Sequence, residues 1–331
     1  MSTARHIIAL LKSHLEGEDR QFYSAALQMA AYEARLGHGK LAQEIRELID
    51  QAKERKSVIE QTPGIIPLAQ PKGDLANLVS VRYPETRLSE MILQPELESR
   101  LKRILTEQKQ QKRLREHNLS PRRKLLFVGP PGSGKTMTAA ALAGELHLPL
   151  FTTLYESIIG KFMGETASRF RVIFNAMNVT KGVYLFDEFD EFDAIGTQRM
   201  TGNDVGEIRR ILNSFLMFLE TDNSQSIIIA ATNHPSLLDN ALFRRFDDVI
   251  KYKLPNAKMI RQLIRMRLVT FDIGWKDWSR IIDAAEGLTQ AEIVRATDEA
   301  AKQAILSNTK QVSEETLILA ILERKDITFE Q

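Results

Sequence analysis

Cysteine is absent from the 331-residue sequence, and this absence excludes several kinds of chemistry. A chain without cysteine forms no disulfide, no thiolate zinc site and no thiol nucleophile. Long apolar runs are also missing, because a run such as 227–231 is far shorter than the roughly 18 residues that a membrane helix needs. The apolar patch at 7–11 ends at Lys12 without a cleavage site. We therefore expect no signal peptide, no membrane segment and a cytoplasmic location.

The chain has little net charge. Lysine and arginine number 45 and aspartate and glutamate 43, which leaves a formal charge of +2. This balance argues against a protein whose main partner is nucleic acid or an anionic membrane. At about 150 residues per domain, the length predicts about two domains, or three if one is small.

Four regions can be distinguished along the chain. Residues 1–56 show helical spacing of apolar residues and predict a small N-terminal helical module that docks a substrate or a partner. Residues 57–87 carry four prolines and two glycines and predict a linker. Residues 88–255 alternate β-type runs with helical patterns, whereas residues 256–331 show helical patterns only. We therefore expect an α/β core followed by a lid of four helices.

The alternation in the core indicates βαβ units, which place parallel strands in one sheet with helices on both faces. The predicted fold class is α/β with a five-stranded parallel sheet. The candidate strands are residues 124–128, 150–153, 183–186, 227–231 and 249–252.

Ten basic residues lie between Arg100 and Lys124. Such a stretch is typical of a solvated helix face, and it can also contact an acidic surface of a partner or of a neighbouring subunit.

A glycine-rich loop follows the first core strand and fits the pattern GxxxxGK[ST]. Its residues are Gly129, Pro130, Pro131, Gly132, Ser133, Gly134, Lys135 and Thr136. A loop with few bulky side chains lets backbone N–H groups point at phosphate oxygens, and the following helix adds its positive N-terminal end. We expect Lys135 to reach the β- and γ-phosphates of ATP and the Thr136 hydroxyl to bind Mg²⁺.

Two acids end the apolar run 183–186, namely Asp187 and Glu188. A buried strand that stops in Asp-Glu places both carboxylates at the ligand-binding edge of an open α/β sheet. We expect Asp187 to hold Mg²⁺ through water and Glu188 to polarise the water that attacks ATP.

These motifs, in this order, resemble the AAA family of the AAA+ ATPases, in particular the branch with FtsH, katanin and spastin. The resemblance covers about residues 88–322 and implies a P-loop AAA+ core. The segment 227–233 resembles the sensor 1 strand, so the resemblance implies that Asn233 lies between the γ-phosphate and the lytic water. Arg244 and Arg245 match the arginine fingers, which implies that they stabilise charge on ATP bound by the next subunit of a homo-oligomer, expected to be a hexamer.

A further segment resembles the first pore loop of the family, with Lys161, Phe162 and Met163 between two glycines. In an assembled ring this loop places one aromatic side chain per subunit in the central channel. A phenylalanine and a methionine form an apolar grip that accepts many polypeptide sequences. Residues 196–204 resemble a second pore loop with a weaker pattern.

Two segments depart from the family. The usual Gly-Ser/Thr-Gly-Ala-Asp of the lid appears as residues 287–292 with Gln290 at its centre, and residues 88–93 lack the usual adenine-contacting pattern. No adenine contact is therefore assigned. The helix over 208–219 ends in Leu219-Glu220 where the family commonly has Asp-Gly.

The resemblance implies an ATPase that remodels, unfolds or threads polypeptide. The chain contains no HExxH, so proteolysis needs a separate partner. A finer resemblance is to small bacterial ATPases encoded beside subtilisin-like proteases in phage defence, which implies a serine protease partner and an antiviral role.

Two alternatives remain. The first is a DNA-associated loader or transposition helper, which is supported only by the stretch 100–124. The second is a nucleotide-gated scaffold without catalysis, which requires that Glu188 or the arginine fingers be inactive.

Overall fold

A computed structural model gives the structure of the chain. It describes residues 73–158, 165–188, 205–235 and 243–329, and six isolated positions before them. By its contacts the chain divides into two compact units, residues 1–67 and residues 68–331. In the first unit, Ala26, Met29, Ala30 and Gln43 are helical. The rest of the predicted N-terminal helical module lies outside the described residues.

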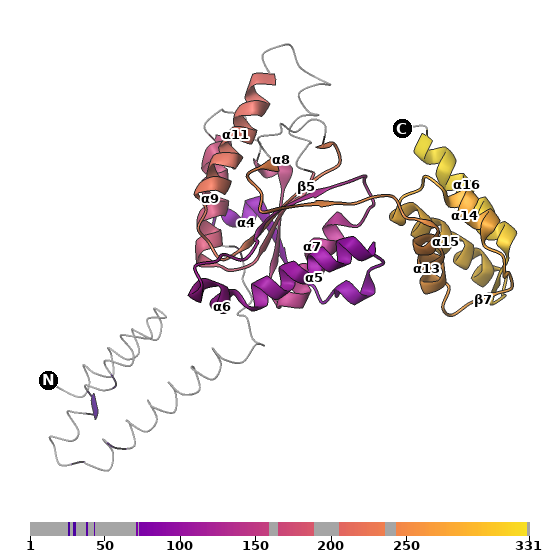
Figure 1. Cartoon of the computed structure of the whole chain (residues 1–331), viewed down its shortest axis with the longest axis horizontal. Coiled ribbons are helices and arrows are strands. Elements are labelled where there is room, and N and C mark those ends of the chain that lie inside the picture. Colours follow the sequence, from indigo (N-terminus) through magenta and orange to yellow (C-terminus); the bar gives the residue numbers. More distant parts are fainter. Residues whose placement is uncertain are drawn as a thin grey trace. The chain divides into compact units, whose positions relative to one another are not determined.

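A mixed sheet forms the centre of the second unit (Figure 1). The order of its strands is β1-β3-β4-β5-β2-β6. The five strands from β2 to β6 run parallel to one another. Their bounds are β2 Lys124–Val128, β3 Leu150–Thr153, β4 Val183–Phe186, β5 Ile227–Thr232 and β6 Asp248–Lys251. Each predicted strand is therefore present, with its ends within one residue of the prediction.

Alternate residues of each strand pack on opposite faces of the sheet, because side chains alternate along a strand. One face is covered by α5 (Pro95–Lys109) and α7 (Lys135–Leu146), and its core includes Leu125 and Phe127 of β2. The other face is covered by α4 (Leu75–Leu78), α9 (Glu165–Val179) and α11 (Val205–Thr221), with Leu126 and Val128 in its core. The sheet thus lies between two helical layers, and Figure 1 shows them on either side of it.

The prediction of a linker over 57–87 is wrong for its last part. Residues 75–82 form α4 and the strand β1 (Val79–Arg82), which pairs antiparallel with β3 at the edge of the sheet. The sheet therefore has six strands among the described residues instead of five, and the core begins before residue 88. A four-residue edge strand is too short to show alternation, and the glycine and prolines around it suggested a loop.

Short elements connect the larger ones. Residues 88–90 form the 3-10 helix η1 (Leu88–Glu90), α6 (Gln111–Glu116) follows α5, and α8 (Tyr155–Ile158) follows β3.

Four helices build the body of the lid among the described residues. Between residues 256 and 329 they are α13 (Ala257–Arg267), α14 (Ser279–Ala285), α15 (Gln290–Leu306) and α16 (Glu314–Phe329). They enclose a separate core that includes Leu263, Trp278, Ile293 and Ile321. Two two-residue strands that were not predicted, β7 (Asp272–Ile273) and β8 (Gln311–Val312), pair in parallel beside them.

Candidate nucleotide-binding site

The glycine-rich loop lies between the end of β2 and the start of α7, in the context that its pattern requires. Gly132 and Gly134 have φ angles of 71° and 95°, which is left-handed backbone that glycine adopts readily. A Cβ atom on Gly132 would lie 2.8 Å from both the Cβ of Ala291 and the Oγ1 of Thr289. Glycine is thus required here by backbone conformation and by the close approach of the lid.

Lys135 is the first residue of α7 and is only 7% exposed. Its Nζ donates hydrogen bonds to the carbonyl oxygens of Gly129 (2.8 Å) and Pro130 (2.9 Å) and to Oδ1 of Asn233 (2.7 Å). These oxygens hold the ammonium group over its own loop. Phosphate oxygens are stronger acceptors for an ammonium than neutral carbonyls, because the hydrogen bond is then charge-assisted on both sides.

The hydroxyl of Ser133 lies within the same loop. Its Oγ is buried, and it has no hydrogen-bond partner among the described residues. A buried hydroxyl without a partner is uncommon, since leaving it unsatisfied costs about 1–3 kcal/mol. The orphaned hydroxyl fits a loop whose missing partner is a ligand rich in acceptors, as a phosphate chain is.

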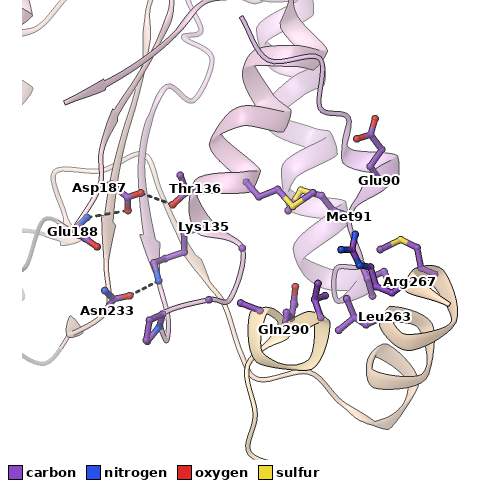
Figure 2. Close-up of a pocket in the computed structure, with 18 residues that line it drawn as sticks. Glu90, Met91, Lys135, Thr136, Asp187, Glu188, Asn233, Leu263, Arg267 and Gln290 are labelled. Atoms are coloured by element: carbon purple, nitrogen blue, oxygen red, sulfur yellow. Dashed lines mark hydrogen bonds between the residues drawn. The ribbon is translucent and has the colours of Figure 1, made fainter. Parts of the chain in front are cut away.

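Asp187 and Glu188 follow β4, at the same edge of the sheet as the loop (Figure 2). Oδ2 of Asp187 accepts a hydrogen bond of 2.5 Å from the Thr136 hydroxyl, and its Oδ1 accepts one of 3.1 Å from the backbone N–H of Glu188. Glu188 has a φ of 50°, a conformation that is uncommon for a residue with a side chain. Such backbone is found more often at functional sites, where the surrounding structure enforces it.

The predicted magnesium ligands therefore lie together. Mg²⁺ takes oxygen ligands, often one or two from the protein with the remainder from phosphates and water. The Thr136 hydroxyl and the Asp187 carboxylate are such ligands, and their mutual hydrogen bond places both oxygens within reach of one ion. The donor set fits Mg²⁺ bound together with a nucleotide.

Asn233 directly follows β5, which lies between β4 and β2 in the sheet. This strand order places Asn233 between the acids at the end of β4 and the loop at the end of β2. Its amide oxygen contacts Lys135, as the dashed line in Figure 2 shows. A single asparagine after a strand is often a turn residue. Here the strand order and the hydrogen bond to Lys135 place Asn233 within the site.

A cavity of about 480 Å³ extends from these groups to the lid. Its polar end is lined by the phosphate loop, Asp187, Glu188 and Asn233. Its other end is largely apolar and is lined by residues that the sequence did not assign. These are Glu90, Met91, Ile92, Leu263, Met266, Arg267, Gln290, Ala291 and Val294.

Weak signals in the sequence could have identified some of these residues. Met91 and Ile92 form an apolar pair directly before the first long helix of the core, within the segment that lacks the family's usual adenine pattern. Leu263 and Met266 are three residues apart on α13 and so lie on one side of that helix. The sequence does not show that this side meets the core, because the contact exists only after the lid has folded against it.

The lid contacts the phosphate loop directly. The backbone N–H of Ala291, at the start of α15, donates a hydrogen bond of 3.1 Å to the carbonyl oxygen of Gly132. Gln290, which the sequence left without a role, lies beside this contact with its side chain at the cavity (Figure 2).

Within the lid, Arg267 forms hydrogen bonds of 2.9 and 2.5 Å to the Asp298 carboxylate. These bonds raise the pKa of Arg267 above its ordinary value and join α13 to α15.

Arg244 and Arg245 do not line the cavity of their own chain. Arg244 is exposed, whereas Arg245 is half-buried and its Nε lies 2.8 Å from Oε1 of Glu220. The structure thus brings together the phosphate loop, Asp187, Glu188 and Asn233, and it leaves the two arginines elsewhere on the surface.

Several predicted residues lie outside the described part of the chain. They are Lys161, Phe162 and Met163 of the first pore loop and residues 196–204 of the second.

The basic stretch 100–124 is partly neutralised within the chain. Arg122 forms ion pairs with Glu107 (2.6 Å) and Asp248 (3.0 Å), and Arg100 pairs with the same Asp248. Arg123 pairs with the buried Asp222. Lys102 also pairs with Glu98, and Lys109 with Glu145. Five of the ten cations that supported the DNA-associated alternative are therefore paired within the chain.

No helix among the described residues is both long and apolar enough to cross a lipid bilayer.

Comparisons with known proteins agree with this site. Residues 125–254 match the model of the ATPase family associated with various cellular activities (AAA). An uncharacterized AAA family ATPase, y4kL of Sinorhizobium fredii (strain NBRC 101917 / NGR234), is 32% identical over 90% of this chain and 88% of its own length.

Other relatives share part of their length with this chain. The ATP-dependent zinc metalloprotease FtsH of Helicobacter pylori (strain ATCC 700392 / 26695) is 30% identical over 75% of this chain but 40% of its own length. The proteasome-activating nucleotidase of Thermococcus onnurineus (strain NA1) is 34% identical over 61% of this chain and 52% of its own length.

Among solved structures, the crystal structure of the FIGL-1 AAA domain shares the fold. The TM-score is 0.59 at 23% identity, over 74% of this chain and 85% of that one. One conclusion follows from the phosphate loop, the two acids after β4 and the extent of the match to y4kL. The chain belongs to the AAA family of ATPases, enzymes that hydrolyse ATP.

Proposed function

We propose that this chain is the ATP-hydrolysing subunit of a homo-oligomeric ring, with six subunits, that unfolds or threads polypeptide through a central pore. The observation that carries the enzymatic part is the meeting of Lys135, Thr136, Asp187, Glu188 and Asn233 at one edge of the sheet. ATP and Mg²⁺ are the expected ligands of this site.

Each of these side chains has a role in the proposed reaction. Lys135 and the backbone N–H groups of the loop hold the phosphates of ATP. Thr136 and, through water, Asp187 would hold Mg²⁺, which when bound would neutralise charge on the phosphate oxygens. Glu188 accepts a proton from the attacking water, and Asn233 orients that water beside the γ-phosphate.

The proposed active site is shared between subunits. Arg244 and Arg245 lie away from the cavity of their own chain, which supports their use by a neighbour. An arginine supplied in trans to a nucleotide-hydrolysing enzyme is worth roughly 10³ to 10⁵ in rate in well-studied cases. An isolated subunit should therefore hydrolyse ATP very slowly.

Polypeptide is the proposed substrate, for two reasons. The segment Lys161, Phe162 and Met163 carries an aromatic–methionine pair between glycines, which suits a sequence-tolerant grip on an extended chain. Two relatives named above, a metalloprotease and a proteasome-activating nucleotidase, have names that refer to proteolysis. Because no HExxH occurs in this sequence, proteolysis requires a separate polypeptide, and a serine protease acting in antiviral defence is the partner that the sequence resemblance implies.

Turnover in the presence of an unfolded protein tests this proposal. Casein should stimulate ATP hydrolysis by the wild-type ring, and double-stranded DNA should not. Phe162→Ala should remove the stimulation while affecting turnover without casein much less, and Leu119→Ala, at an exposed apolar residue outside the site, is the matched control. Stimulation by DNA alone, or full stimulation by casein in the Phe162→Ala ring, would contradict the threading proposal.

A trap variant identifies the natural substrate and the partner. Glu188→Gln loaded with ATP should retain bound polypeptides, because it binds nucleotide without completing hydrolysis. The same variant loaded with ADP is the control, and a protease among the retained proteins would name the partner.

A further inference from the structure

The segment that carries the two arginines is fastened to the fold immediately after them. Phe246 is 7% exposed and packs into the core beneath α9 and α11. Oδ2 of Asp247 accepts hydrogen bonds from the backbone N–H groups of Arg123 (2.8 Å) and Lys124 (2.9 Å). Asp248 is nearly buried and pairs with two arginines. Residues 246–248 therefore have fixed positions relative to the sheet.

Arg245 is also held, in this case by an ion pair. Its Nε lies 2.8 Å from Oε1 of Glu220, near the C-terminal end of α11. The side chain of Arg245 is 31% exposed and that of Glu220 is 53% exposed. A half-exposed ion pair of this kind contributes little to global stability, so its effect is chiefly to fix the direction of the Arg245 side chain. Glu220 occupies one of the two positions at which the sequence departs from the Asp-Gly common in the family.

Arg244 is different from its neighbour. It is exposed, and it forms no hydrogen bond or ion pair with the described residues. The charge of Arg244 is available to another molecule, whereas Arg245 already has a carboxylate.

We propose that the two arginines have separate tasks. Arg244 is the catalytic arginine that contacts the triphosphate bound by the neighbouring subunit. Arg245 is a positioning residue that acts through its ion pair with Glu220 and fixes the direction in which Arg244 projects. This inference rests on the proposed function, because it requires an active site shared between subunits.

Single substitutions separate the two tasks. Arg244→Ala should lower turnover in the assembled ring by about 10³-fold, because the transition state loses its cation. Arg245→Ala and Glu220→Ala should each lower turnover by roughly 10-fold, since a displaced Arg244 still carries its charge. The ATP dissociation constant of the isolated subunit should stay within about twofold of wild type in all three variants, because the arginines lie outside the binding cavity of their own chain. Arg280→Ala, which breaks the exposed Arg280–Glu314 ion pair of 3.3 Å in the lid, is the matched control.

Exchange of the two charges is the decisive experiment. The double variant Glu220→Arg/Arg245→Glu keeps an ion pair at this position with its polarity reversed. If Arg245 positions the segment, this variant should recover turnover to within about threefold of wild type. If Arg245 contacts the neighbour's triphosphate, the variant presents a carboxylate to a phosphate, and turnover should fall below that of Arg245→Ala.

The outcomes distinguish this inference from the proposed function. Equal losses in Arg244→Ala and Arg245→Ala without recovery by charge exchange would overturn the division of tasks and leave the shared site intact. A mixture of Lys135→Ala and Arg244→Ala subunits tests the shared site itself, since each supplies the group that the other lacks. Turnover should reappear on mixing, and its failure to reappear, together with full activity of isolated subunits, would overturn both proposals.

Discussion

Nζ of Lys135 lies 2.7 Å from Oδ1 of Asn233, although 98 positions separate the two residues in the sequence. The contact exists because β2 and β5 are neighbours in the sheet, so that the residues after these strands meet at one edge. It joins the group that we expect to bind phosphate to the group that we expect to orient water (Figure 2).

Asn233→Ala should impair hydrolysis more than binding. The amide oxygen shares the Lys135 ammonium with two backbone carbonyls, so Lys135 retains partners after the substitution. Turnover should fall by about 10- to 100-fold, because the attacking water loses an orienting group. The measurement is steady-state phosphate release beside the dissociation constant for ATP. A parallel loss of affinity would show that Asn233 serves to hold Lys135.

Lys135→Ala should weaken binding of ATP by about 100-fold, because each hydrogen bond from a charged group contributes about 1.5–3 kcal/mol. The measurement is titration with a fluorescent ATP analogue. Lys102→Ala removes an exposed lysine paired with Glu98 on α5 and should leave affinity unchanged. Unchanged affinity in Lys135→Ala would place the phosphates elsewhere.

Glu188→Gln should bind ATP with normal affinity and hydrolyse it about 10²- to 10⁴-fold more slowly, because glutamine cannot accept the proton of the attacking water. Glu286→Gln, at an exposed position of the lid, is the control. Single-turnover hydrolysis checks the chemical step, and sedimentation in the presence of ATP checks whether the ring persists. Normal turnover would show that another group activates the water.

Gly132→Ala should weaken nucleotide binding by pushing the lid away from the phosphate loop, because the new Cβ would lie 2.8 Å from the Cβ of Ala291 and from the Oγ1 of Thr289. Gly287→Ala is the matched control, since Gly287 also has a positive φ of 89° but no atom within 4 Å of the added Cβ. Both variants should lose about 1–2 kcal/mol of stability through backbone strain. Only Gly132→Ala should show a raised dissociation constant, and equal affinity in the two would contradict the role of the lid contact.

Asp248→Asn should destabilise the fold by about 2–4 kcal/mol. The two arginines would then face a nearly buried amide that carries no negative charge. Urea unfolding measures the change in the free energy of unfolding. Asp272→Asn changes an exposed aspartate of β7 and should remain within about 0.5 kcal/mol of wild type. Equal stability of the two variants would show that the ion pairs of Asp248 contribute nothing.

Most strands and site residues of the core can be predicted from strong local patterns in the sequence. Buried parallel strands are continuous apolar runs, and residues 124–128 and 183–186 were identified for that reason. Gly132 and Gly134 meet a backbone requirement that is local to the loop, so the phosphate-binding pattern is visible without the fold. The edge strand over 79–82 was missed because its pairing with β3 is a property of the sheet, and four residues carry too little pattern of their own.

The sequence by itself determined the α/β class, the phosphate loop and the acids that end the fourth strand, because each depends on residues close together in the chain. Only the tertiary structure decided that Met91 and Leu263 line one cavity, that Ala291 of the lid touches Gly132, and that Glu220 holds Arg245. These contacts join segments far apart in sequence. Their existence depends on strand order and on the packing of helices, which no local pattern specifies.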